Sequence, residues 1–186
     1  AEMWVSAPTA TLVVGEYKTG GHHVLQGTDD LFAVLEENQV TLATMKASRY
    51  VKFFHVEVDG WEKALSMILE VVEMLLTVQR QWMYLENIFA APDIQRQSPN
   101  ETKIFEKVDK SWKGLMKTVA ANPNCITVGC HKGRKELFVR HSAALDVVQK
   151  RLEEYLETKR ASFPRFYFLS NDELLEILAQ TKDPRA

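Results

Sequence analysis

Apolar residues in the middle of the chain recur every three or four positions, and this spacing predicts one long amphipathic helix over residues 61–89. The stripe starts at Trp61 and continues to Met83 and Leu85. A helix of this length is about 43 Å long at 1.5 Å per residue. Its apolar face is broad enough to need cover on several sides, so we expect it to be the spine of a helical bundle.

One helix is predicted before this spine and another after it. The first follows Thr28, whose hydroxyl is expected to cap it, and it ends near Lys46. Pro92 stops the spine. The next helix starts at Ser98 and Glu101, which match the pair of side chains that cap a helix start reciprocally. Its apolar face is expected to consist of Phe105, Val108, Trp112, Leu115 and Val119.

The last third of the chain predicts a loop, a fourth long helix and a short final helix. Residues 122–133 are rich in Asn, Pro and Gly and are expected to form a loop. Apolar spacing then indicates a helix from Leu137 to near Arg160. Residues 163–169 are expected to be extended, and residues 170–173 have the pattern of a second capping box.

The only β pattern lies near the N-terminus, where residues 11–17 and 22–26 flank a turn that contains Gly20 and Gly21. The predicted fold class is therefore mainly α, an elongated bundle of long antiparallel helices with a short N-terminal β-hairpin. We divide the chain into an N-terminal extension at 1–10, a β-hairpin at 11–27, a helical bundle at 28–160, and an aromatic segment with a C-terminal helix at 161–186.

Charge and composition limit the classes of partner and the cellular setting that we expect for the chain. The chain has 23 basic and 25 acidic residues and a formal net charge of -2, so no general field attracts nucleic acid or an acidic membrane surface. The most apolar run, residues 67–76, contains two glutamates and is shorter than the ~20 residues that a membrane span needs. Two cysteines and a start without signal-peptide character indicate an intracellular, reducing setting.

No residue pattern predicts catalysis, cofactor binding or metal binding. Cys125, Cys130 and His131 are zinc-type ligands, but no second pair follows them, so reduced thiols in a loop explain them better. Residues 129–133 lack the spacing and the hydroxyl of a phosphate-binding loop. His141 falls on an apolar helix face, where a buried histidine is commoner than a general base.

A small basic and aromatic patch is formed by Lys46, Arg49, Tyr50, Lys52 and Phe53. Nucleic-acid binding needs more positive charge than this patch has. We interpret the patch as a solvated junction between two helices.

A second aromatic cluster lies near the C-terminus, where Phe-Pro-Arg-Phe-Tyr-Phe-Leu occupies residues 163–169. Four aromatic side chains and an arginine in seven residues are typical of interface anchors, although core packing explains the composition equally well. The candidate hinge or docking residues are Phe163, Arg165, Phe166, Tyr167 and Phe168.

Two parts of the chain resemble the linker region of dynein heavy chains. Trp82, Leu85 and Phe89, followed by Val108, Asp109, Trp112 and Met116, fit that region in order and spacing. The stretch Phe-Pro-Arg-Phe-Tyr-Phe-Leu-Ser-Asn-Asp-Glu-Leu-Leu-Glu-Ile-Leu at residues 163–178 is similar to the family's most recognisable signature. The form of residues 170–173 resembles axonemal dyneins more than cytoplasmic ones.

The resemblance implies a mechanical role. In this family the linker is a rod of helical bundles that lies across a ring of ATPase modules and alternates between bent and straight states in the power stroke. The isolated chain is then not an enzyme and holds no cofactor, whereas ATP and magnesium belong to the motor ring of the parent chain. The implied partners are the ring modules of the same heavy chain and other dynein subunits, with no nucleic acid and no membrane, in the axoneme of a cilium or flagellum.

Two other functions are compatible with the residues alone. The first is a helical adaptor that binds partner proteins through an exposed groove. The second is a small metal-dependent enzyme that uses the loop of Cys125, Cys130 and His131.

Overall fold

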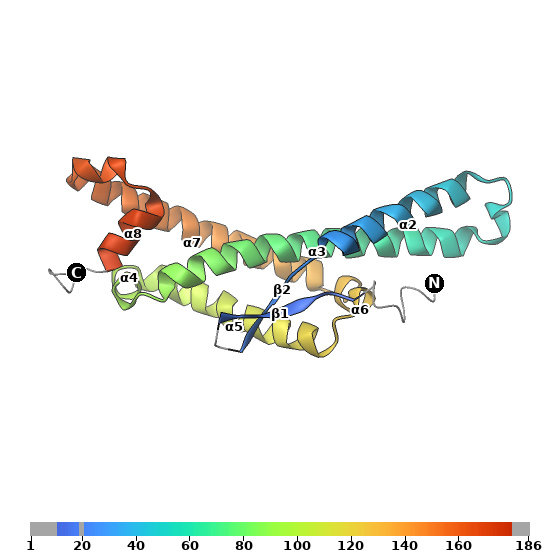
Figure 1. Cartoon of the computed structure of the whole chain (residues 1–186), viewed down its shortest axis with the longest axis horizontal. Coiled ribbons are helices and arrows are strands. Elements are labelled where there is room, and N and C mark those ends of the chain that lie inside the picture. Colours follow the sequence, from blue (N-terminus) through green and yellow to red (C-terminus); the bar gives the residue numbers. More distant parts are fainter. Residues whose placement is uncertain (1–10, 19–20, 180–186) are drawn as a thin grey trace. The chain divides into compact units, whose positions relative to one another are not determined.

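A computed structural model of the chain describes residues 11–18 and 21–179 (Figure 1). The predicted extension at residues 1–10 lies outside the described residues. The described part is mainly helical with one short antiparallel hairpin, which confirms the predicted class of helices with an N-terminal hairpin. Its strands are β1 (Val14–Tyr17) and β2 (His22–Leu25), and its helices are α2 (Asp29–Ala47), α3 (His55–Phe89), α4 (Pro92–Gln97), α5 (Pro99–Ala121), α6 (Cys125–Gly129), α7 (Arg134–Ser162) and α8 (Asn171–Ala179), with 3-10 turns η3 (Val51–Phe53) and η4 (Pro164–Phe168).

The hairpin pairs Val14 with Leu25 and Tyr17 with His22. Gly21 has a φ of 67°, a left-handed conformation that glycine adopts without steric cost. The backbone N–H of Leu12, just before β1, donates to the carbonyl of Pro123 at 2.7 Å. The hairpin is therefore tied to a segment that is distant in the sequence.

The described residues form two compact units, each considered by itself. In the described part of the chain, unit 1 falls within residues 11–77 and 112–139, and unit 2 within residues 78–111 and 140–179. Each unit contains part of α3, α5 and α7. Fully buried side chains include Leu35, Leu65, Ile68, Leu75, Trp112, Met116 and Phe138 in unit 1, and Trp82, Leu85, Ile94, Leu145 and Leu156 in unit 2.

In unit 1, α6 packs closely on α3. A Cβ atom added to Gly129 would lie 2.8 Å from the Cα of Ile68, a distance that real Cβ atoms do not adopt. Only glycine allows this approach of the two helices without a shift. Asn124 starts α6, because its Oδ1 accepts from the backbone N–H groups of Ile126 at 3.0 Å and Thr127 at 3.1 Å.

One predicted helix boundary and one predicted helix cap were wrong. The spine helix begins at His55 rather than Trp61, because Val58 is buried and continues the apolar stripe toward the N-terminus. Thr28 does not cap α2 with its side chain. Its backbone is already helical, whereas a capping side chain needs an extended backbone to reach the first amides.

Two predicted conformations were also wrong. The expected loop at residues 122–133 contains the short helix α6. The expected extended segment at residues 163–169 is mostly the 3-10 turn η4, in which the N–H of Phe166 donates to the carbonyl of Phe163 at 2.9 Å. Pro164 suits the first turn of such a helix, because its missing N–H would have no helical partner there.

Candidate functional site

Of the candidate hinge or docking residues, Phe163 lies between α7 and η4, and the other four lie on η4, all within unit 2. We call residues 163–168 the aromatic segment. Phe168 is 91% exposed, and Phe163 and Tyr167 are each 59% exposed. The arrangement therefore favours a surface role over the core packing that composition alone left open.

Phe166 is the most enclosed ring of the aromatic segment. It is half-buried and lies with its centroid 5.4 Å from that of Phe163, the two ring planes tilted by 47°. Aromatic pairs in this distance range attract each other beyond the area that they bury. Arg165 is exposed beside them. The segment thus presents three exposed rings and one positive charge on a supported turn.

Arg160, in the last turn of α7, holds the segment in place. Its Nη2 donates to the carbonyl of Leu169 at 3.0 Å and to Oδ1 of Asn171 at 2.7 Å, and its Nε donates to the carbonyl of Phe166 at 3.4 Å. Its Nη1 forms an ion pair with Glu157 at 2.8 Å. One guanidinium, whose donors are fixed in a plane, therefore joins the end of α7 to η4 and to the start of α8.

The start of α8 confirms the predicted capping box. The N–H of Ser170 donates to Oε2 of Glu173 at 2.7 Å, and the N–H of Glu173 is 3.3 Å from the accepting hydroxyl of Ser170. These bonds to Ser170 lower the pKa of the Glu173 carboxyl. α8 packs against α4, and both Leu174 of α8 and Ile94 of α4 are buried. The segment is therefore supported on both sides by ordered helices.

The cysteine and histidine residues are not arranged as a metal site. Cys125 is buried, which raises the pKa of its thiol to about 12 and leaves it protonated at neutral pH. Cys130 is exposed, and His131 Nδ1 lies 2.9 Å from the carbonyl of Lys132. Within residues 11–18 and 21–179, no three side chains of His, Cys, Asp or Glu form a group that could hold a metal ion.

His141 is buried on α7 in unit 2, as its apolar position suggested. Burial, with a smaller contribution from the charge of Arg140, lowers the pKa of its imidazole. The ring is therefore neutral at physiological pH. None of the helices in the described part of the chain is both long enough and apolar enough to cross a membrane.

The basic and aromatic patch lies at the junction between α2 and α3, as interpreted from the sequence. Lys46 forms ion pairs with Glu62 at 2.6 Å and Asp59 at 3.0 Å, and these carboxylates raise the pKa of Lys46. The guanidinium of Arg49 lies over the ring of Tyr50, 4.8 Å from its centroid. Tyr50 and Phe53 are largely exposed. One of the three cations of the patch is thus neutralised by carboxylates of α3, and its two aromatic side chains face solvent.

The comparison with known proteins agrees with the expected family. Residues 1–186 match the family described as "Dynein heavy chain, N-terminal region 2". The chain belongs to this region of the dynein heavy chains, which confirms the resemblance found in the sequence.

Individual relatives are long axonemal and flagellar heavy chains. The chain is 52% identical over 186 residues, its whole length, to Dynein axonemal heavy chain 2 of Mus musculus. It is 52% identical over 163 residues, 88% of the chain, to Dynein axonemal heavy chain 6 of Homo sapiens. It is 48% identical over 174 residues, 93% of the chain, to the Dynein-1-beta heavy chain, flagellar inner arm I1 complex, of Chlamydomonas reinhardtii. The chain spans about 4% of the length of each of these relatives.

Proposed function

We propose that this chain is a mechanical linker, or lever, segment of a dynein heavy chain that couples ATP-driven changes in a motor ring to microtubule-based movement. The observation that carries the proposal is the match to the N-terminal heavy-chain region over all 186 residues. The relatives are named as axonemal or flagellar chains, so we place the parent protein in the axoneme of a cilium or flagellum.

The internal packing suits a part that transmits force. A lever must move without yielding, and close-packed protein interiors have low compressibility. α3 is a single helix of 35 residues, about 52 Å long at 1.5 Å per residue. In unit 2, Trp82 is fully buried and its indole N–H donates to Oδ1 of Asp109 at 2.9 Å, joining α3 to α5. Such contacts allow helices to move together rather than slide past one another.

In this proposal the chain does not hydrolyse ATP. ATP and magnesium bind to the motor ring, which belongs to the remainder of a heavy chain of which these 186 residues are about 4%. The partners are the ring modules of the same heavy chain and other dynein subunits. The net charge of -2 argues against nucleic acid as a partner.

We assign the contact with the motor ring to the aromatic segment. Exposed aromatic side chains beside an arginine are the residue types that contribute most to protein interfaces. Their support by Arg160 and by the capped start of α8 presents them on a fixed turn. A contact of this kind selects between two arrangements of a lever only where it forms more favourably in one of them.

The test uses the complete heavy chain with Tyr167→Ala and Phe168→Ala together. Both rings are exposed, so folding should be unaffected, and the ATPase rate should stay within about twofold while microtubule gliding slows several-fold. Val147→Ala is the matched control, because Val147 is an exposed apolar residue of unit 2 outside the segment. Gliding at the normal rate in the double variant would contradict the assignment.

The parent protein can be tested separately with an antibody against this chain in extracts of ciliated cells. A very large polypeptide that salt releases from axonemes is the expected result. A small soluble polypeptide would exclude a motor chain and favour the helical adaptor.

A further inference from the structure

The start of α7, in unit 1, carries positive charge where acidic side chains are usual. The N-terminus of a helix is the positive end of its dipole, so cations there are unfavourable. Lys132, Arg134 and Lys135 nevertheless lie at this end, and the acidic residue of the first turn is Glu136. Lys135 is paired with Glu70 of α3 at 2.5 Å. Lys132 and Arg134 have no carboxylate within ion-pair distance in the described part of the chain.

Of these two cations, Arg134 is the buried one. It is 8% exposed, and its Nη1 has no hydrogen-bond partner among the residues that the structure describes. Burial lowers the pKa of its guanidinium. A charge is costly to remove from water unless it is paired, and buried polar groups without a partner are rare in native proteins. The unpaired guanidinium therefore points to an anionic partner that the described residues do not supply.

The backbone offers further donors at the same place. The N–H groups of Lys135 and Glu136 donate to no acceptor within the described part of the chain. Gly133 precedes the helix and has no side chain to cap them, and a Cβ atom added to it would meet nothing within 4 Å. Side chains on a helix lean toward its N-terminus, so the guanidinium of Arg134 extends toward this end. Open amides and a guanidinium at a helix start are the donors that bind an oxyanion.

The number of donors indicates the class of anion. Two cations and a helix end offer more than one positive charge, which favours a doubly charged phosphate group over a carboxylate. A guanidinium also matches two phosphate oxygens with parallel N–H donors. Residues 129–133 lack the pattern of a nucleotide-binding loop, so a single phosphate is expected rather than a nucleotide.

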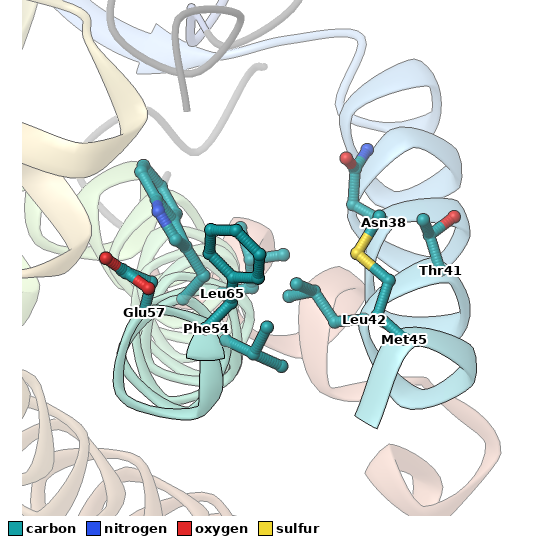
Figure 2. Close-up of a pocket in the computed structure, with 9 residues that line it drawn as sticks. Asn38, Thr41, Leu42, Met45, Phe54, Glu57 and Leu65 are labelled. Atoms are coloured by element: carbon teal, nitrogen blue, oxygen red, sulfur yellow. The ribbon is translucent and has the colours of Figure 1, made fainter. Parts of the chain in front are cut away.

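The hollow between α2 and α3 provides a contrast within unit 1 (Figure 2). It is lined mainly by apolar side chains such as Leu42 and Phe54, and its one charged lining residue is the exposed Glu57. A carboxylate repels an anion, and apolar side chains donate no hydrogen bonds to it. Apolar surroundings alone therefore do not make an anion site, and the start of α7 differs by its donors.

We propose that the first turn of α7 binds a phosphate ion through the guanidinium of Arg134 and the backbone N–H groups of Lys135 and Glu136. Lys132 adds positive charge at the rim. The bound ion caps the start of α7 in place of the side chain that Gly133 lacks. The site goes beyond the lever role and does not depend on it, so either proposal can fail without the other.

The test is hydrogen exchange, measured by mass spectrometry, on the complete heavy chain in inorganic phosphate and in chloride. Equal ionic strength in the two buffers removes general screening from the comparison. Phosphate should slow the exchange of the amides of Lys135 and Glu136 several-fold, because its oxygens accept from both. The protection should be lost in Arg134→Gln. It should persist in the matched control Arg151→Gln, since Arg151 is an exposed arginine of α7 in unit 2.

Two exposed side chains give a second test that does not alter a buried residue. Lys132→Gln should raise the phosphate concentration that gives half of the protection several-fold, because a favourable charge is lost. Glu136→Gln should lower that concentration, because its carboxylate repels phosphate. No protection by phosphate, protection only by a non-hydrolysable ATP analogue, equal protection in Arg134→Gln, or an unchanged half-saturation in both exposed variants would overturn the proposal.

Discussion

The hydrogen bond between Trp82 and Asp109 gives a quantitative test of how α3 and α5 are held together in unit 2. The indole N–H donates to the Asp109 carboxylate at 2.9 Å, and the Trp82 side chain is fully buried. Trp82→Phe keeps most of the apolar ring and removes the N–H donor. Asp109→Ala removes the acceptor, and the double variant completes a cycle that isolates the energy of the pair.

The expected coupling energy follows from the burial of the two partners. A hydrogen bond to a charged group contributes about 1.5–3 kcal/mol to stability. Asp109 is only half-buried, so water can replace the lost donor, and we expect a coupling of about 1 kcal/mol. Trp82→Ala should cost about 3–5 kcal/mol, because it also leaves a cavity at a fully buried site.

The measurement is urea unfolding, monitored by far-ultraviolet circular dichroism, of the 186-residue chain without substitutions and of the three variants of the cycle. A matched cycle pairs Trp82→Phe with Lys117→Ala, since Lys117 is an exposed residue of the same helix as Asp109. That cycle should be additive to within about 0.5 kcal/mol. A coupling below this limit for Trp82 and Asp109 would refute the view that the bond contributes to stability.

Three further predictions address other parts of the molecule. Gly129→Ala should lower the melting temperature and reduce the free energy of unfolding by about 1–3 kcal/mol, because the new methyl group would collide with Ile68. Gly114→Ala, at an open position inside α5, should instead raise the free energy of unfolding by up to about 1 kcal/mol. If calorimetry found both changes neutral, close packing of α6 on α3 would be excluded. Arg160→Lys should speed hydrogen exchange of the backbone amides at residues 163–171, because an ammonium group cannot replace the planar donors of the guanidinium. Arg165→Lys should not speed this exchange. Equal protection in both variants would contradict the tethering role of Arg160. The pKa of His141 is lower in the folded chain than in the unfolded chain, so the unfolded chain binds a proton at His141 more readily. The free energy of unfolding therefore decreases as the pH falls below the unfolded pKa of about 6.5. His141→Gln should therefore flatten the decline in unfolding free energy between about pH 7.5 and about pH 5.5, and an unchanged slope in urea titrations would show that His141 does not cause it.

The long helices were predictable because each keeps an apolar face over many turns. Leu65, Val72 and Leu75 in α3 are all buried, as the spacing required. Helix starts were less predictable, since capping depends on backbone conformation that residue type does not determine. Thr28 and Ser170 are both good capping residues, yet only the hydroxyl of Ser170 accepts from the third residue of its helix, whereas the backbone of Thr28 is helical and its side chain makes no cap bond.

The short elements could not be predicted from the spacing of apolar residues, for a different reason. α6 has five residues, too few for a helical period to appear, and its only sequence signal is Asn124 ahead of apolar residues. Residues 163–169 were expected to be extended because Phe163-Pro164 breaks the helical pattern, but residues 164–168 form the 3-10 turn η4, in which the carbonyl of Phe166 accepts from Arg160. Tertiary contacts therefore overrode local preference in this segment.

The composition of the aromatic segment identified it as a candidate interface, but it could not separate a surface from a core. Exposure depends on which elements pack over a segment, and no element covers Phe168 among the described residues. The role of Arg160 was not predictable either, because it depends on carbonyl groups that η4 turns toward the end of α7. An arginine in the last turn of a helix before a break was the only available signal.

The hydrogen bond from the backbone N–H of Leu12 to the carbonyl of Pro123 has a consequence for how the chain folds during synthesis. Synthesis proceeds from the N-terminus, so the hairpin leaves the ribosome long before the residues that hold it. Unit 1 cannot be completed until residues 112–139 have followed, although most of its residues precede position 78. A protease cut within residues 78–111 would likewise divide unit 1 into two pieces joined only by noncovalent contacts, and a chain ending before residue 112 would lack Trp112, Met116 and Phe138 from its core.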